Sequence, residues 1–243
     1  MGRVIAMWSG PRNISTAMMR AWENRADTTV WDEPLYACYL DQTGLSHPGR
    51  DHVLQAHAHE IPYEAVATRL VQAPDSPVVY QKHMAHHLLP GMDRAWMDDA
   101  TVTHAFLLRD PREMILSLHA RYPEMGLADT GMPQQVEIFQ RCREAGETPP
   151  VVVARDVLEN PRGTLASLCD VLQLDFDEAM LSWPSGSRDS DGAWADFWYD
   201  SVRASTGFET WRPREGELPT HLVEVHEECQ ALYDQLHVHR IVA

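Results

Sequence analysis

Short apolar segments alternate with segments of helical spacing along most of this 243-residue chain. Strands are predicted where apolar and β-branched residues run together, at residues 3–8, 28–31, 76–82, 102–109 and 149–155. Their apolar character is continuous rather than confined to alternate residues, which is typical of strands covered on both faces. The alternation therefore predicts an α/β fold in three layers, with helices on both faces of a mostly parallel sheet.

The predicted helices lie between and after these strands. Helical spacing occurs at residues 15–24, 62–72, 111–122, 133–146 and 161–174, and another helix is expected to begin near Pro34. Residues 42–60 are expected to form a loop with one short helix. A long amphipathic helix over residues 219–239 closes the chain and could provide a homodimer contact.

The alternation breaks over residues 181–218, which are rich in Trp, Gly, Ser and Asp. We expect a single domain over residues 1–243, in which residues 181–218 form a lid or an acceptor-site segment. Aromatic faces and carboxylates together would suit a small hydrophobic acceptor, including one with an amine, through cation–π contact. The alternative is that these aromatic residues pack an irregular segment onto the sheet.

The charge and cysteine pattern limits the partners. With 20 basic and 36 acidic residues the formal charge is −16, which argues against nucleic acid and against anionic membrane surfaces as partners. The sequence has no apolar run of about 18 residues, so no membrane span is expected. The four cysteines are far apart and form no C-x-x-C pair, as in a reduced cytoplasmic protein. The histidines in "HVLQAHAHE" and "KHMAHH" lack a known metal-ligand spacing, so we expect no metal.

The stretch "WSGPRNIST" follows the first predicted strand and precedes a helix. In an open parallel sheet ligands bind beyond the carboxyl ends of the strands, and a helix N-terminus there offers free N–H groups to an anion. Arg12 adds a planar fork suited to an oxyanion. The candidate anion-binding residues are Gly10, Pro11, Arg12, Asn13, Ile14, Ser15 and Thr16. The alternative is an ordinary strand–helix turn capped by Asn13 or Ser15.

A second stretch, "FLLRDPREMILSLHARY", places Arg109 at the end of the fourth predicted strand and Ser117 eight residues later, on the next helix. A phosphate held by both would lie beside the strand end and against the side of the helix. Taken alone, the pair could equally be a surface arginine and an unrelated helix serine. Together the two stretches predict one anion-binding groove.

The two stretches resemble the motifs of sulfotransferases that use 3′-phosphoadenosine 5′-phosphosulfate (PAPS). The phosphosulfate loop of that family reads P-R-S-G-[ST]-[ST], which is similar to residues 11–16, and its 3′-phosphate motif, R-[DN]-P-[RK] with a later Ser, is similar to residues 109–112 with Ser117. The resemblance covers about residues 3–174, and the later part looks like a bacterial branch of the family. It implies a P-loop-like sulfotransferase fold and transfer of a sulfuryl group from PAPS to a hydroxyl or amine of a small acceptor.

The chain departs from the family pattern at three places. Ile14 stands where the loop usually has a Gly, which leaves the backbone less free to approach a phosphate. Arg155 stands where many members have an aromatic residue near the adenine. Arg212 and Arg214 are the candidates for the basic C-terminal motif that often completes the 3′-phosphate site.

Sulfuryl transfer needs a general base for the acceptor and positive groups for the leaving phosphate. Arg12 is the expected positive group, and Lys82 could add to it. For the base, the resemblance leaves two candidates. Related enzymes with the arginine loop use a Glu at the location of Glu33, whereas cytosolic sulfotransferases carry Lys-Thr-His where this chain has Lys82 and His83. His86 and His87 could also supply the imidazole.

Two other functions fit parts of the sequence. A P-loop phosphotransferase would need a Lys at the position of Ile14 and an acidic metal ligand after a strand. A nucleotide-binding protein without catalytic activity could share the whole fold, because a fold alone does not determine activity.

Overall fold

The computed structural model of this chain describes residues 2–73 and 76–243. Its sheet has five parallel strands in the order β2-β3-β1-β4-β5. The strands are β1 (Arg3–Ser9), β2 (Thr28–Asp32), β3 (Val78–Met84), β4 (Val102–Leu108) and β5 (Val151–Val153). The predicted parallel α/β fold is confirmed.

The central strand explains the three layers. Residues Val4, Ala6 and Trp8 of β1 belong to one apolar cluster, and the alternating residues Ile5 and Met7 belong to another. All five side chains are completely buried. Because successive strand residues point to opposite faces, both faces of the sheet are covered, as the continuous apolar runs predict.

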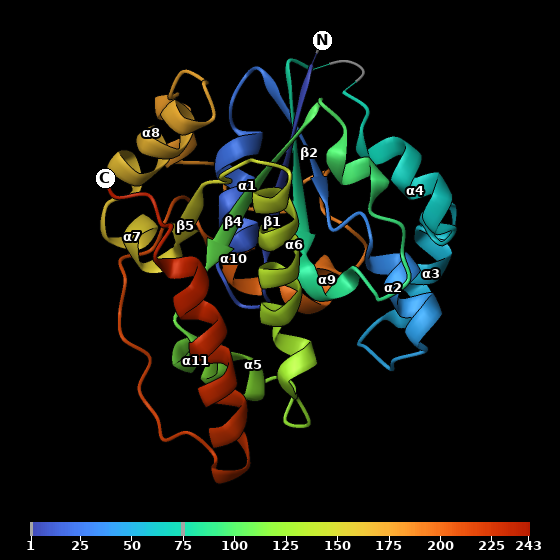
Figure 1. The fold of residues 1–243 in the computed structure, drawn as a ribbon, viewed down its shortest axis with the longest axis vertical. Coiled ribbons are helices and arrows are strands. Elements are labelled where there is room, and N and C mark those ends of the chain that lie inside the picture. The colour runs from blue at the N-terminus through green and yellow to red at the C-terminus, as the bar shows by residue number, and fades with distance from the viewer. Residues whose placement is uncertain (1, 74–75) are drawn as a thin grey trace.

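Helices cover the two faces separately (Figure 1). One face packs against α1 (Ser15–Glu23), α7 (Ala154–Glu159) and α8 (Pro161–Val171). The other packs against α4 (Tyr63–Leu70), α5 (Pro111–His119), α6 (Met132–Glu144) and α11 (Val223–His237). In the view of Figure 1, α6 and α11 lie in front of the sheet and α1 lies behind it.

A third apolar cluster lies beside the sheet and includes part of the segment 181–218. It joins α2 (Tyr36–Thr43), α3 (Arg50–Ala56) and α9 (Ala195–Trp198), and α10 (Asp200–Ala204) follows. Trp194 is buried in this cluster, and Trp183 is buried in the cluster on the face of the sheet that α1, α7 and α8 cover. These two aromatic residues therefore serve packing. The 3₁₀ segments are Ala58–Glu60, Ala85–His87, Ala95–Asp98, Leu127–Thr130, Glu178–Leu181 and Thr220–Leu222.

Two strand boundaries differ from the prediction in ways that affect the site. Strand β3 begins at Val78 and continues to Met84, so Lys82 and His83 are successive strand residues. Strand β5 ends at Val153, where its pairing with β4 ends, and Arg155 lies on α7 instead of at a strand end. The predicted helix near Pro34 begins at Tyr36, because Glu33 turns the chain with a positive φ of 40°.

The C-terminal helix α11 packs within the chain. Its residues Cys229, Tyr233 and Leu236 are buried against the face that also holds α5 and α6. The homodimer and the single-domain organisation stay predictions. Within residues 2–73 and 76–243, no helix combines the length and the apolar character that crossing a bilayer demands.

Candidate functional site

A cavity of about 1000 Å³ opens beyond the carboxyl ends of the central strands. It is lined by the loop after β1, by Glu33 after β2, by Lys82 of β3 and by Arg109 after β4. Residues from 198 to 212 close another side. The two predicted anion-binding stretches and the predicted catalytic residues Arg12, Glu33 and Lys82 therefore share one cavity, while the structure places His83 elsewhere.

The loop after β1 has an unusual backbone. Arg12 and Ile14 have φ values of 60° and 57°, in the left-handed region that costs non-glycine residues about 1–2 kcal/mol each. Ile14 therefore occupies a position that suits Gly, which explains why the loop motif of the family that the sequence resembles has a Gly there. Helix α1 begins directly afterwards, and no side chain among the described residues caps its N-terminus, so its first N–H groups are available to an anion.

Side chains hold this loop against the stretch after β4. Asn13 Nδ2 donates to the Leu107 carbonyl oxygen at 3.1 Å, and Arg109 donates to the Arg12 carbonyl oxygen at 2.7 Å. Arg12 Nε donates to Ser117 Oγ at 3.1 Å. Pro11, Arg12, Asn13, Ile14, Ser15, Thr16 and Arg109 line the cavity. Ser117 is buried behind Arg12 and supports that guanidinium.

Positive charge gathers at this loop although the chain as a whole carries −16. Burial lowers the pKa of Arg12, and the neighbouring charges of Arg121, Arg109 and Arg214 lower it further. Arg121 and Arg212 also line the cavity. Cations that repel one another in the absence of a ligand favour binding of a polyvalent anion, because the anion relieves that repulsion.

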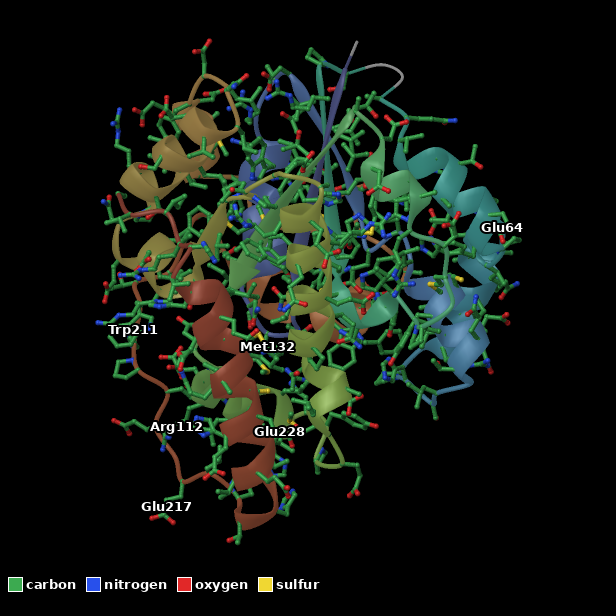
Figure 2. The ribbon with its side chains drawn as sticks, viewed as in Figure 1. Glu64, Arg112, Met132, Trp211, Glu217 and Glu228 are labelled. Carbon is green, nitrogen blue, oxygen red and sulfur yellow. The ribbon has the colours of Figure 1, made fainter. Side chains whose placement is uncertain are left out.

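The C-terminal arginines arrive on a strap, defined here as residues 206–218. Trp211 Nε1 donates to Glu113 Oε1 at 3.2 Å, and the Arg155 guanidinium lies 4.1 Å from the centroid of the Trp211 ring. Arg112 donates to the Gly216 carbonyl oxygen at 2.5 Å. Figure 2 labels Trp211 and Glu217 on this strap and Arg112 of α5 (Pro111–His119) next to it. These contacts hold Arg212 at the cavity.

Glu33 lies at the other end of the cavity, next to a buried cation. Its Oε1 is 2.5 Å from Lys82 Nζ, and its Oε2 is 3.9 Å from Nδ1 of His87. Burial raises the pKa of Glu33; the Lys82 charge opposes this and the Asp32 charge adds to it. Glu33 is 9% exposed and lines the cavity, so its carboxylate is placed to accept a proton from a bound group.

Lys82 has a second carboxylate partner. Its Nζ lies 2.8 Å from Asp32 Oδ1, across the register of β2 and β3, and 2.5 Å from the Tyr199 hydroxyl. Burial opposes the charge of Lys82, but Asp32 and Glu33 outweigh it and raise the pKa of the ammonium well above its usual value. Lys82 is therefore a permanent cation in this cluster.

His83 lies outside the cavity, on the opposite face of the sheet from Lys82. Its ring stacks on Trp8 with 4.3 Å between centroids, and its Nε2 is 3.0 Å from Gln81 Oε1. Burial lowers the pKa of His83 to about 3. The reason is the strand itself: successive residues of β3 point to opposite faces, so Lys82 and His83 cannot enter one site. The cavity is instead lined by His86 and His87.

Gly10 also lies beside the cavity rather than in its lining. A Cβ at this position would lie 2.3 Å from the carbonyl oxygen of Thr130. The glycine is therefore required by close backbone packing between the loop after β1 and the segment before α6.

A family model described as "Sulfotransferase domain" matches residues 3–232. The chain belongs to this family. Two solved sulfotransferase domains share its fold. The domain of the Synechococcus PCC 7002 olefin synthase has a TM-score of 0.54 and 19% identity, with 93% of this chain and 94% of that chain covered. The domain of the curacin biosynthetic pathway has a TM-score of 0.57 and 14% identity, with 100% of this chain and 99% of that chain covered. The sulfotransferase fold predicted from the sequence is confirmed.

Two curated relatives come from Arabidopsis thaliana. The branched-chain-amino-acid aminotransferase-like proteins 2 and 1 are 32% and 34% identical to this chain over 237 residues, which is 97% of its length. The chain spans 42% of the length of each relative. Their similarity therefore concerns one part of a longer protein.

Three residues of this candidate site escaped the sequence analysis. Asp32 adjoins Glu33 in "VWDEP", and two consecutive carboxylates after a strand were a usable signal. Tyr199 lies in the aromatic segment, and only the packing of α9 brings its hydroxyl to Lys82. Arg121 follows α5 at the end of "SLHAR", where the spacing from Arg109 held no recognisable pattern.

Proposed function

We propose that this sulfotransferase-family chain transfers a sulfuryl group from PAPS to a hydroxyl or amine of a small acceptor. The observation that carries the proposal is that Arg12, Arg109, Arg121 and Arg212 line the same cavity as the uncapped first turn of α1 and the buried carboxylate Glu33. Anion-binding groups and a proton acceptor in one cavity are what this reaction needs.

The donor would occupy the end of the cavity that faces α1. The first N–H groups of α1, together with Arg12, would hold the 5′-phosphosulfate, and Arg109 would hold the 3′-phosphate. Ser117 supports this arrangement through its bond to Arg12 Nε. A volume of about 1000 Å³ is at the upper end of the usual range for ligand pockets, which leaves room for an acceptor beside a nucleotide.

Glu33 would be the general base. As the acceptor oxygen or nitrogen bonds to sulfur and the bond from sulfur to the leaving phosphate breaks, the acceptor's proton passes to the Glu33 carboxylate. Arg12 would neutralise the charge that develops on the leaving phosphate. Because burial raises the pKa of Glu33, its ionised form is a stronger base than an exposed glutamate. Transfer should rise with pH as Glu33 loses its proton.

The acceptor end of the cavity suits an uncharged or cationic molecule. Its lining includes Tyr36, Tyr122 and Trp198, together with the carboxylate Asp129. Burial lowers the pKa of His86 to about 3, so its imidazole is neutral at physiological pH. Aromatic faces beside carboxylates favour an amine or a neutral hydroxyl compound. The name of the curated relatives makes hydrophobic amino acids and the amines derived from them reasonable first compounds to test.

The proposal is tested by incubating the chain with ³⁵S-labelled PAPS and a library of amines, amino acids and small alcohols. Labelled organic product is expected. Calorimetry should show binding of the nucleotide product, 3′-phosphoadenosine 5′-phosphate (PAP), and weaker binding of ADP, which lacks the 3′-phosphate. ATP consumption without PAP binding would favour a phosphotransferase. PAP binding without labelled product from any acceptor would favour a nucleotide-binding protein that lacks catalysis.

A further inference from the structure

Asp32 is a buried carboxylate that the reaction does not touch. It is 3% exposed, and its neighbour Glu33 is the carboxylate that lines the cavity. Asp32 ends β2, and its register partner on β3 is Lys82. A carboxylate so fully removed from water must be compensated by partners, because burying an unpaired charge costs several kcal/mol.

Both oxygens of Asp32 have partners. Oδ1 is 2.8 Å from Lys82 Nζ, and Oδ2 accepts from the Tyr199 hydroxyl at 2.7 Å and from the Gly192 backbone N–H at 3.2 Å. Tyr199 is itself held by Trp194, whose Nε1 donates to its hydroxyl at 3.0 Å. Two of these partners come from the segment 181–218, which therefore encloses Asp32.

Lys82 stands between the two carboxylates. Its ammonium has three N–H donors, and it has three partners: Asp32, Glu33 and Tyr199. One positive charge thus faces two carboxyl groups. If Lys82 served Glu33 alone, it would strongly favour the ionised carboxylate and make Glu33 a weak base. Sharing the ammonium with Asp32 prevents this.

We propose that Asp32 is a positioning residue for proton transfer: it balances the charge of Lys82, so that Glu33 keeps enough basicity to take the acceptor's proton. The inference rests on the proposed role of Glu33 as the base. It assigns Lys82 to the control of Glu33, since all its donors are directed to the cluster. Tyr199 and Gly192 hold Asp32 in place, which links this control to the segment 181–218.

The groups that face Glu33 come from several elements. Lys82 contacts it from β3, Asp32 adjoins it on β2, and His87 approaches it from the 3₁₀ turn after β3. Tyr36 begins α2, and burial, together with the Glu33 charge, raises the pKa of its hydroxyl. Tyr199 completes the surroundings. Burial lowers the pKa of His87 well below its usual value, so this ring adds no positive charge near neutral pH.

The test is a direct titration of Glu33 that needs no acceptor. Protein labelled with ¹³C at the glutamate carboxyl is titrated by NMR, and the Glu33 signal is assigned by its loss in Glu33→Gln. In Asp32→Asn the whole charge of Lys82 acts on Glu33, so its midpoint should fall by about 1 pH unit or more. Where an acceptor is turned over, the acidic limb of kcat/KM, which reports the free enzyme, should move by the same amount. An unchanged Glu33 midpoint would overturn the proposal.

A matched control removes a carboxylate just before the start of β2, at the opposite end of this strand from Asp32. Asp27 precedes β2 and pairs with Arg25 at 2.8 Å, so Asp27→Asn should leave the Glu33 midpoint unchanged. If Asp32→Asn does not fold, Lys82→Met and the double variant Asp32→Asn/Lys82→Met replace it. The double variant should titrate below Lys82→Met, and equal midpoints would refute an effect of Asp32. Calorimetry with PAP on the wild-type chain tests the donor assignment separately.

Discussion

Replacing Arg109 by alanine tests the donor site most directly. The arginine has five N–H donors, of which one binds the Arg12 carbonyl oxygen at 2.7 Å and another binds Glu113 Oε2 at 3.1 Å. The remaining donors lie on a residue that lines the cavity. The substitution thus removes a charged contact to the anion and one support of the loop after β1.

The expected loss follows from the energy of one charged hydrogen bond. Such bonds contribute about 1.5–3 kcal/mol, and about 1.4 kcal/mol corresponds to a tenfold change in Kd. Arg109→Ala should therefore weaken PAP binding by roughly 10- to 150-fold. Arg109→Lys should bind PAP with an affinity between those of the wild type and Arg109→Ala. Lysine keeps the positive charge but lacks the planar guanidinium that can bind the loop and an anion at the same time.

Isothermal titration calorimetry with PAP at fixed ionic strength measures this loss. Arg141→Ala is a suitable control, because Arg141 pairs with Asp98 on the exposed surface and its loss changes net charge equally. It should bind PAP like the wild type. If Arg109→Ala also binds PAP with wild-type affinity while remaining folded, Arg109 is not part of the donor site and the argument from the two converging strand ends fails.

Three further outcomes follow from the same structure. Glu33→Gln should lower turnover about 100-fold or more with PAP affinity nearly intact. His83→Gln should stay active, because the His83 ring lies outside the cavity. The reverse pattern in steady-state kinetics would make His83 the base. Burial lowers the pKa of His83 to about 3, so as the pH falls the unfolded chain takes up a proton at this histidine before the folded chain does. The contribution of His83 to the free energy of unfolding should therefore be complete above about pH 6.5 and fall by about 1.4 kcal/mol per pH unit below it. If urea unfolding down to pH 4 shows the same pH dependence in His83→Gln as in the wild type, this expectation is wrong. Limited proteolysis should cleave residues 181–211 more slowly with PAP bound, and equal rates in both states would mean that the segment is rigid scaffold.

Much of the fold could be predicted because its signals are local. Continuous apolar strands require cover on both faces, and β1 shows this cover with alternate residues in two clusters. The Arg12 loop and Arg109 were found for a similar reason: each follows a parallel strand, and parallel strands bring their carboxyl ends to one edge. The two stretches meet, with Arg109 donating to the Arg12 carbonyl oxygen, because β1 and β4 are neighbouring strands of the sheet.

The position of His83 could not be predicted this way, because it depends on whether the third strand ends before or after that residue. The sequence placed the end of the third strand at residue 82, which would leave His83 free to turn into the site. In the structure β3 continues to Met84, and His83 points to the face opposite Lys82. Strand ends depend on pairing with neighbours, here with β1 up to Ser9, and that pairing is a tertiary property.

By itself the sequence determined the parallel sheet, the loop after β1 and the arginine after β4, since the signal for each lies in residues close together in the chain. Only the tertiary structure decided that Lys82 is shared between Asp32 and Glu33, and that Tyr199 closes this cluster from 117 residues away. The physical reason is burial: the partners of a buried charge are set by which segments exclude water from it, and that follows from packing across the whole chain.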